Sequence, residues 1–207
     1  MFFVDGFNLY HALESNPKFH KYKWLNMHEL ALQFSKPPYE NLQKVRYFTA
    51  YATWKSVGTV SRHKAYVKAL QNVGVEIILG RFQEKYRTCR AHNGCGLSFP
   101  IHEEKLTDVN IAVAIIEACV TKQCDILYLI SGDNDLVPAL EAAKRLCPSV
   151  EVTVVLPINA KAKTLTQICH ANGYTITAMN EPFLAASQFP DQVIVGGKSY
   201  TRPPTWS

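Results

Sequence analysis

The 207-residue sequence predicts an α/β fold with a mostly parallel sheet of about five or six strands and helices on both faces. Two observations lead to this prediction. Short apolar segments alternate with segments of helical periodicity along most of the chain, which is the order of βαβ units. The apolar run 126–130 has no polar alternation, as expected for a parallel strand that is buried on both faces.

The first half of the chain predicts three strands and three helices. The opening Met1-Phe-Phe-Val is an apolar strand that ends in Asp5. Asn26 has the position of an N-cap for the second helix, with Glu29 at the capping-box spacing. β-Branched and aromatic residues favour a strand at 44–51. The expected strands are 1–5, 44–51 and 75–79, and the expected helices are 9–14, 24–34 and 61–72.

The second half continues the alternation. Gly132 ends a strand, and Pro138 lies in the first turn of the helix that follows it. The expected strands are 126–131, 151–156 and 174–179, and the expected helices are 103–122, 136–146 and 163–172. We expect the inner stripe of helix 103–122 to consist of Val109, Ala112, Val113 and Ile116.

Two segments depart from this rhythm. Residues 81–102 are interpreted as a loop insertion within a domain that spans 1–180. From 181 to 207 the pattern changes to a small C-terminal appendix packed on the domain, with a short hairpin that turns at Gly196-Gly197. The appendix could reach a partner subunit, so a homo-oligomer stays open.

The composition is that of an ordinary globular protein, with 47% hydrophobic and 19% charged residues. The net charge of +5 suits a nucleic-acid partner, although enzymes with neutral substrates are often mildly basic too. No apolar run reaches the length of about 18 residues that a spanning helix needs. Met1-Phe-Phe-Val lacks the basic region of a signal peptide. We therefore expect a cytoplasmic protein with no membrane partner, whose six cysteines are mostly buried thiols.

Acidic residues stand at the ends of two expected strands and near the start of a long helix. Asp5 ends the first strand, and Asp133 and Asp135 follow strand 126–131. Asp108 lies early in the expected helix 103–122 and could lean over this edge. Two like charges about 4 Å apart repel by on the order of 4 kcal/mol at an effective dielectric of about 20. Such a cluster calls for a cation, and an all-oxygen site favours Mg²⁺ or Mn²⁺.

Three motifs occur in an order that resembles the NYN domain, specifically its LabA-like branch. They are Asp5-x-x-Asn8, Lys105-x-x-Asp108 and Ser131-Gly-Asp-x-Asp135-Leu. NYN domains are similar to PIN-domain nucleases, and the resemblance covers roughly residues 1–180. It implies a Rossmann-like, PIN-like fold and metal-dependent ribonuclease chemistry. Leu136 departs from the family pattern, in which an aromatic residue is frequent at this position.

The roles that we assign follow from the residue types. Asp5, Asp108 and Asp133 are the expected metal ligands, and Asp135 is a further ligand or an acid behind them. These four aspartates are the expected catalytic residues. Asn8 is added to them because it could orient a carboxylate or a phosphate. Ser131 could hydrogen-bond to an aspartate oxygen. Lys105, Ser131 and Asn134 are assigned to substrate binding. The competing interpretation is structural, since an aspartate after a strand is often only a helix N-cap.

The insertion 81–102 contains a second set of metal-type ligands. Cys89, His92, Cys95 and His102 offer four zinc-type ligands within fourteen residues, although no CxxC pair is present. A loop without its own core would gain order from Zn²⁺. The alternative is a flexible loop with two free thiols.

The same insertion alternates cations with aromatic residues. Cations can contact phosphates while rings stack on unpaired bases, which suits single-stranded RNA. The alternative is an ordinary solvated surface. The cations of the insertion are Arg81, Lys85, Arg87 and Arg90.

Three functions remain open from the sequence. The first is a Mg²⁺- or Mn²⁺-dependent ribonuclease. The second is an RNA-binding or regulatory interaction module that retains the acidic pocket without turnover. The third is a small-molecule phosphohydrolase. A dinucleotide-binding enzyme is disfavoured, because no Gly-x-Gly-x-x-Gly follows the first strand.

Overall fold

The central element is a six-stranded sheet in which every strand pair is parallel, in the order β3-β2-β1-β6-β7-β8. A computed structural model describes residues 1–36, 38–89 and 95–206. The strands are β1 (Phe2–Asp5), β2 (Val45–Thr49), β3 (Glu76–Leu79), β6 (Ile126–Ile130), β7 (Glu151–Leu156) and β8 (Thr175–Ala178). The predicted α/β fold with a mostly parallel sheet is therefore confirmed.

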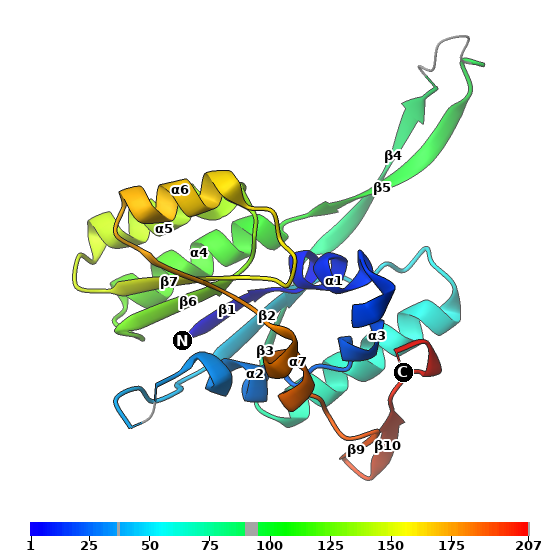
Figure 1. Cartoon of the computed structure of the whole chain (residues 1–207). Coiled ribbons are helices and arrows are strands. Elements are labelled where there is room, and N and C mark those ends of the chain that lie inside the picture. Colours follow the sequence, from blue (N-terminus) through cyan, green and yellow to red (C-terminus); the bar gives the residue numbers. More distant parts are fainter. Residues whose placement is uncertain (37, 90–94, 207) are drawn as a thin grey trace.

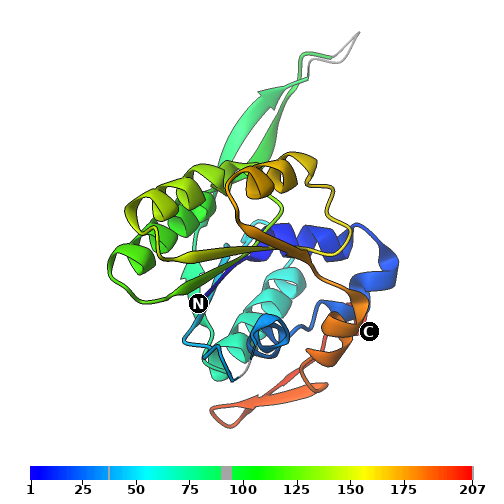
Figure 2. The same ribbon diagram turned by 60° about the vertical axis from the view of Figure 1, so that its left-hand side comes forward.

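Helices cover both faces of this sheet, as Figures 1 and 2 show. One face packs against α1 (Gly6–Glu14), α2 (Met27–Phe34), α3 (Val57–Asn72) and α7 (Glu181–Ala186). The other face packs against α4 (Thr107–Val120), α5 (Val137–Leu146) and α6 (Lys163–Ala171). Two apolar clusters separated by the sheet form the core, which explains why its central strands carry no polar alternation.

Capping side chains determine where α2 and α3 begin. The Asn26 carboxamide oxygen accepts hydrogen bonds from the backbone amides of His28 and Glu29, so α2 begins at Met27. Similarly, the Ser56 hydroxyl accepts from the Thr59 amide at the start of α3. Both helices therefore have boundaries that differ from the predicted 24–34 and 61–72.

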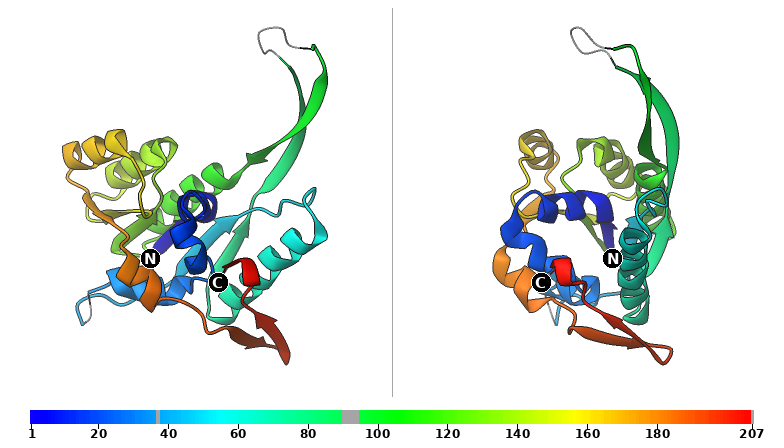
Figure 3. Two further views of the ribbon diagram at one scale, coloured as in Figure 1. Left: turned by 45° about the vertical axis from the view of Figure 1, so that its right-hand side comes forward. Right: turned by 90° about the vertical axis from the view of Figure 1, so that its right-hand side faces the viewer.

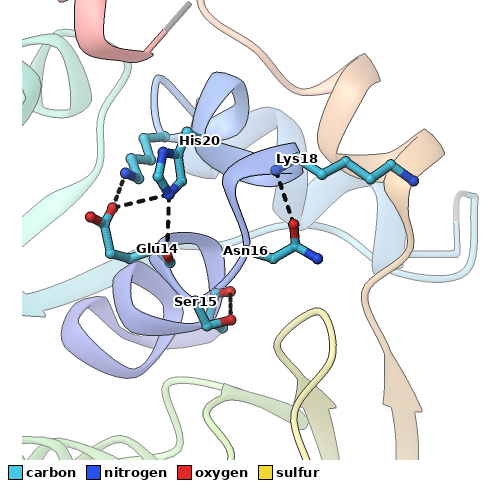
Figure 4. A network of polar contacts seen from close by, with 7 residues as sticks. Glu14, Ser15, Asn16, Lys18 and His20 are labelled. Carbon is cyan, nitrogen blue, oxygen red and sulfur yellow. Dashed lines mark hydrogen bonds and ion pairs between the residues drawn. The ribbon is translucent and has the colours of Figure 1, made fainter.

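A polar corner turns the chain out of α1 (Figure 4). The 3-10 helix η1 (Pro17–Tyr22) follows, and the Asn16 side chain caps it by accepting from the backbone amide of Lys18. A ring nitrogen of His20 lies 3.0 Å from the Glu14 backbone oxygen. Lys23 forms an ion pair with the Glu14 carboxylate, and only 5% of the Lys23 side chain is exposed. The corner therefore fixes the end of α1 through local contacts.

The orientation of α4 differs from the predicted one. The helix begins at Thr107, and its buried positions include Ile111 and Ile115. Val109 and Val113, expected in the inner stripe, are 60% and 59% exposed. Apolar residues lie on more than one side of this helix, so periodicity alone could not decide which side meets the sheet.

Most of the described residues in 81–102 belong to two strands and not to an irregular loop. β4 (Arg81–Thr88) and β5 (Ser98–Lys105) pair as an antiparallel ribbon. The ribbon leaves the domain as a long arm (Figure 3). The prediction of a loop was wrong because both faces of this ribbon are largely solvated, so its strands show no apolar alternation.

The C-terminal residues fold back on the helices of one face. They comprise α7, a hairpin of β9 (Gln192–Val195) and β10 (Lys198–Thr201), and the 3-10 helix η3 (Pro204–Trp206). The turn lies at Gly196 and Gly197, which have φ values of 57° and 79°, in the left-handed region that favours glycine. The Trp24 indole donates a hydrogen bond of 2.8 Å to the backbone oxygen of Pro190. No helix in the described part of the chain is long and apolar enough to cross a membrane.

A candidate metal centre at the carboxyl edge of the sheet

Asp5 forms the floor of the candidate site. It is the last residue of β1 and the N-cap of α1, and its side chain is almost completely buried, with 4% of the residue exposed. One carboxylate oxygen accepts from the Asn8 amide at 3.0 Å, and the other accepts from the Ser131 hydroxyl at 2.9 Å. Both carboxylate oxygens are therefore held in fixed positions.

Two contacts tie the loop after β6 to the first helix. The Asn8 carboxamide oxygen accepts from the Gly132 amide at 2.9 Å, and the Ser131 hydroxyl accepts from the Asp133 amide at 3.1 Å. Ser131 is fully buried, so its hydroxyl links Asp5 to Asp133 without competition from water. In this structure Ser131 positions the Asp5 carboxylate, while the Asn8 side chain holds the loop at Gly132 and contacts no carboxylate among the described residues.

Asp133 and Asp108 complete the cluster from two further elements. Asp133 follows β6 and caps the 3-10 helix η2 (Asn134–Leu136) by accepting from the Asp135 amide at 2.9 Å. Asp108 lies in the first turn of α4, which starts after Leu106 adopts a left-handed conformation with φ of 78°. Oxygens of Asp5, Asp108 and Asp133 all lie within 4.8 Å of one another.

The close carboxylates carry raised pKa values. Burial is the main reason that the pKa of Asp5 rises to about 6, and the neighbouring Asp108 and Asp133 add repulsion. The pKa of Asp108 is also raised, first by desolvation and then by Asp133 and Asp135. Among the described residues, no lysine or arginine forms an ion pair with the three clustered aspartates. An oxygen-only donor set without a cationic partner fits a hard divalent cation.

Glu104 is a fourth carboxylate that the sequence interpretation missed. It lies on β5 at the base of the ribbon, where the Thr107 hydroxyl donates a hydrogen bond to it. Desolvation raises its pKa to about 7, and the charges of Asp5 and Asp108 contribute. Only the pairing of β4 with β5 brings it to the site, and no short motif signals that pairing.

The remaining site predictions fall at the rim. Asp135 and Asn134 are exposed in η2, next to the cluster. The Lys105 ammonium group lies 3.1 Å from the Glu103 carboxylate and forms no ion pair with Asp108. Lys85 and Arg87 contact the same Glu103, at 2.7 and 3.5 Å.

These contacts change the expected electrostatics of the ribbon. Three of its cations share the Glu103 carboxylate, whose pKa falls to about 2, mainly through the hydrogen bonds from Lys85 and Lys105. Arg81 is exposed in β4. Arg90 lies outside the described residues. The net positive charge of the ribbon is therefore smaller than the number of its lysines and arginines implies.

The proposed zinc set does not come together with His102. The His102 ring stacks on Trp54 at a centroid distance of 4.0 Å, and its register partner is Glu84. Glu84 precedes Cys89 by five residues, about 16 Å along a strand. His92 lies outside the described residues. Among the described residues, the acidic cluster is the one group with metal-binding geometry.

The fold and the site together define a class of protein. A parallel α/β sheet with clustered aspartates at its carboxyl edge is a candidate metal-dependent domain of the type in which ligands bind at the strand ends. The family model of the NYN domain matches residues 1–179, so the chain belongs to the NYN domain family.

Two similar proteins are informative. The 6-hydroxy-3-succinoylpyridine 3-monooxygenase HspA of Pseudomonas putida is 25% identical, over 99% of this chain and 74% of that protein. The crystal structure of VPA0982, a protein of unknown function from Vibrio parahaemolyticus, matches with a TM-score of 0.57 and 18% identity. That match covers 87% of this chain and 91% of the other, and it supports the fold alone.

Proposed function

We propose that the protein hydrolyses RNA phosphodiester bonds at the acidic centre, with Mg²⁺ or Mn²⁺ held by Asp5, Asp108 and Asp133. The observation that carries this proposal is the convergence of three carboxylates within 4.8 Å on an NYN domain. A divalent ion, when bound, activates water and neutralises charge on the phosphate oxygens. Within the NYN family, we assign the chain to the LabA-like branch.

The residues of this chain would prepare the site. Ser131 and Asn8 hold Asp5 so that its oxygens keep one orientation. Glu104, with a pKa of about 7, can exchange a proton near neutral pH and is a candidate to accept one from water or to donate one to the leaving oxygen. Asp135 and Asn134 lie at the rim, where they can contact the substrate.

The arm of β4 and β5 offers a path for single-stranded RNA. Tyr86 and Phe99 are 67% and 46% exposed on it, and their successive register pairs place one ring on each face of the ribbon. Exposed rings that can stack on unpaired bases, with Arg87 directly across from Phe99, suit single-stranded RNA. Because Glu103 neutralises part of the arm's charge, we assign the larger share of RNA binding to stacking.

The test is a cleavage assay with end-labelled single-stranded RNA in Mn²⁺, in Mg²⁺ and in EDTA. We expect metal-dependent cleavage by the wild type and its loss in the Asp108→Asn, Asp133→Asn double variant. Asp125→Asn is the matched control, since Asp125 is exposed at the other end of β6. Equal cleavage by wild type and double variant would refute the assignment. Absence of cleavage with RNA still bound would favour the non-catalytic RNA-binding module.

The relative HspA supports a second candidate function. Its name describes a monooxygenase acting on 6-hydroxy-3-succinoylpyridine, and the likeness spans 99% of this chain. The corresponding candidate is hydroxylation of a small aromatic acid by O₂, with a two-electron reductant supplied from outside. Oxygen consumption that depends on this pyridine and on a reduced nicotinamide or flavin would favour it over RNA hydrolysis. The small-molecule phosphohydrolase predicts instead the release of phosphate from monoesters.

A further inference from the structure

A cavity of about 130 Å³ lies between α1 and α3, over the carboxyl end of β2. Gly6 and Tyr10 of α1 line one side, and Arg62 and Tyr66 of α3 line the other. Gly6, the residue after Asp5, thus borders the cavity. The cluster of aspartates lies at the ends of the neighbouring strands β1 and β6. The cavity is a neighbour of the acidic centre and shares none of its carboxylates.

The size and walls of the cavity suit one aromatic ring. An engineered apolar cavity of about 150 Å³ holds benzene, so a similar volume accommodates a single six-membered ring. Tyr47 and Tyr66 contribute rings packed edge to face, with centroids 6.1 Å apart. Trp206 of the C-terminal segment packs on Tyr66 at 5.8 Å and lines the cavity as well.

The Tyr47 hydroxyl is a polar group without a protein partner. Tyr47 is 5% exposed and lines the cavity, and no hydrogen bond joins its hydroxyl to any described residue. The hydroxyl itself is not fully enclosed and faces the cavity, where it is free to donate or accept a hydrogen bond. The ring of His63 is engaged elsewhere, with its Nε2 lying 3.2 Å from the Thr49 hydroxyl. A ligand in the cavity would supply the missing partner for Tyr47.

The charged residues in the described lining of the cavity are cations, while the carboxylates of Asp5 and Glu104 act on the Tyr47 hydroxyl from the acidic centre. Lys55 and Arg62 line it, and neither forms an ion pair with a carboxylate among the described residues. Lys23 lines it too, but its ammonium group is paired with Glu14. None of the described residues that line the cavity is an aspartate or a glutamate. Two unpaired cations beside a ring-sized space favour a ligand that carries an anionic group.

We propose that this cavity binds a planar six-membered aromatic ring that carries a carboxylate or a phosphate. The ring packs against the wall that Tyr47 and Tyr66 form, a ring substituent or ring nitrogen hydrogen-bonds to the Tyr47 hydroxyl, and the anion contacts Arg62 and Lys55. Two sources offer this chemistry. One is a pyrimidine nucleotide of an RNA strand, and the other is a free aromatic acid. The site stands whether or not the acidic centre cleaves RNA.

The experiment is an NMR titration of the full chain, in EDTA so that no metal at the acidic centre holds the probes. The probes are nicotinate, uridine 5′-monophosphate and, as a fused-ring control, guanosine 5′-monophosphate. Shift changes are expected at Ala52, Thr59 and Leu9, which line the cavity, and not at Asp133. Binding of nicotinate alone indicates a free aromatic acid as the source, and binding of the uridine nucleotide alone indicates RNA.

Two variants with matched controls locate the contacts. Arg62→Gln should weaken binding of the responding probe by about tenfold, because it removes a charge-assisted contact. Lys68→Gln, the same loss of charge at an exposed position of α3 outside the cavity, should leave binding unchanged. Tyr47→Phe removes only the hydroxyl and should weaken binding roughly two- to tenfold. Asp133→Asn should bind as the wild type does, which separates this site from RNA cleavage.

The proposal is overturned if neither nicotinate nor the uridine nucleotide shifts the cavity resonances at millimolar concentration. It is also overturned if Tyr47→Phe and Arg62→Gln bind with wild-type affinity, or if the guanosine nucleotide binds as tightly as the uridine one.

Discussion

At the scale of single residues, Asp5 combines a structural and a chemical role. Its side chain caps α1, and a carboxylate oxygen of Asp5 lies within 4.8 Å of oxygens of Asp108 and Asp133. The helix-cap interpretation of Asp5 is therefore confirmed, and its role as a metal ligand stays a proposal that this geometry supports. Asp133 repeats this pattern, since it caps η2.

The raised pKa values of the acidic centre predict a pH dependence. The pKa of Asp5 rises to about 6, above the ordinary value near 4 of an unfolded chain. A carboxyl group whose pKa is higher in the folded chain than in the unfolded chain stabilises the protein at low pH. This stabilisation is lost as the pH rises from about 4 through 6. A shift of about two units corresponds to at most about 3 kcal/mol. We expect the metal-free Tm to fall over this window, with these carboxyls contributing several degrees.

Binding of Mn²⁺ requires the ionised carboxylates, so the metal should reverse this trend. We expect the Tm increase caused by Mn²⁺ to be small at about pH 5 and to grow up to about pH 7.5. Thermal unfolding in EDTA and in Mn²⁺ at a series of pH values measures both effects. A Mn²⁺ effect of constant size across this range, or an equal effect in Asp108→Asn, would contradict the assignment.

The sequence predicted the three aspartates because each stands next to a readable strand or helix boundary. Glu104 could not be predicted in the same way. It reaches the centre through the pairing of β5 with β4, and an exposed ribbon carries no apolar pattern from which to predict that pairing. Likewise, the contact of Lys105 with Glu103 depends on side-chain positions that spacing does not determine.

At the scale of elements, α1 is placed against β2 by a close approach at Gly6. A Cβ atom at Gly6 would lie 2.6 Å from the Phe48 backbone oxygen and 2.6 Å from the Tyr47 ring. We expect Gly6→Ala to destabilise the protein by about 1–3 kcal/mol, since the backbone oxygen cannot move aside cheaply. Chemical denaturation measures the change.

Gly58→Ala is the matched control for this substitution. Gly58 lies in the first turn of α3, and its added Cβ would be 3.5 Å from an Arg62 side-chain nitrogen, an ordinary contact. Alanine has the higher helix propensity, so this variant should be neutral or more stable by up to about 1 kcal/mol. Equal destabilisation by both variants would contradict the close packing of α1 on β2.

The arm of β4 and β5 should be separable from the fold. Lys85 and Ile101 are register partners, so a two-residue Asn-Gly turn can replace residues 86–100. Because Phe82, Trp54 and His102 form an aromatic cluster at the base, the shortened arm keeps its anchor. We expect the Tm to change little and the affinity for single-stranded RNA to fall, as measured by fluorescence anisotropy. Unchanged RNA affinity would exclude the arm from RNA binding.

Element prediction succeeded for the strands whose two faces are both buried and failed for the ribbon of β4 and β5, whose two faces are both largely solvated. The buried strands were recognised by their apolar runs, and α2 by its Asn26 cap. The orientation of α4 was mistaken because valines occupy its solvent side at Val109 and Val113.

At the scale of the whole molecule, the sheet order explains where the function can lie. β1 and β6 are central neighbours, and their carboxyl ends bring residues about 126 positions apart into hydrogen-bond contact, as in the Ser131–Asp5 pair. The alternation of strands and helices predicted this arrangement, because parallel neighbours end at one edge. The packing of the C-terminal segment against Trp24 and Tyr66 had no comparable signal, since it depends on single aromatic contacts.

The central claim is that Asp5, Asp108 and Asp133 hold a divalent cation. Anomalous scattering from crystals soaked in Mn²⁺ tests it most directly. We predict an anomalous peak among the three carboxylates and its loss in Asp133→Asn crystals. No peak at this position, with Mn²⁺ bound elsewhere on the chain or not at all, would contradict the claim.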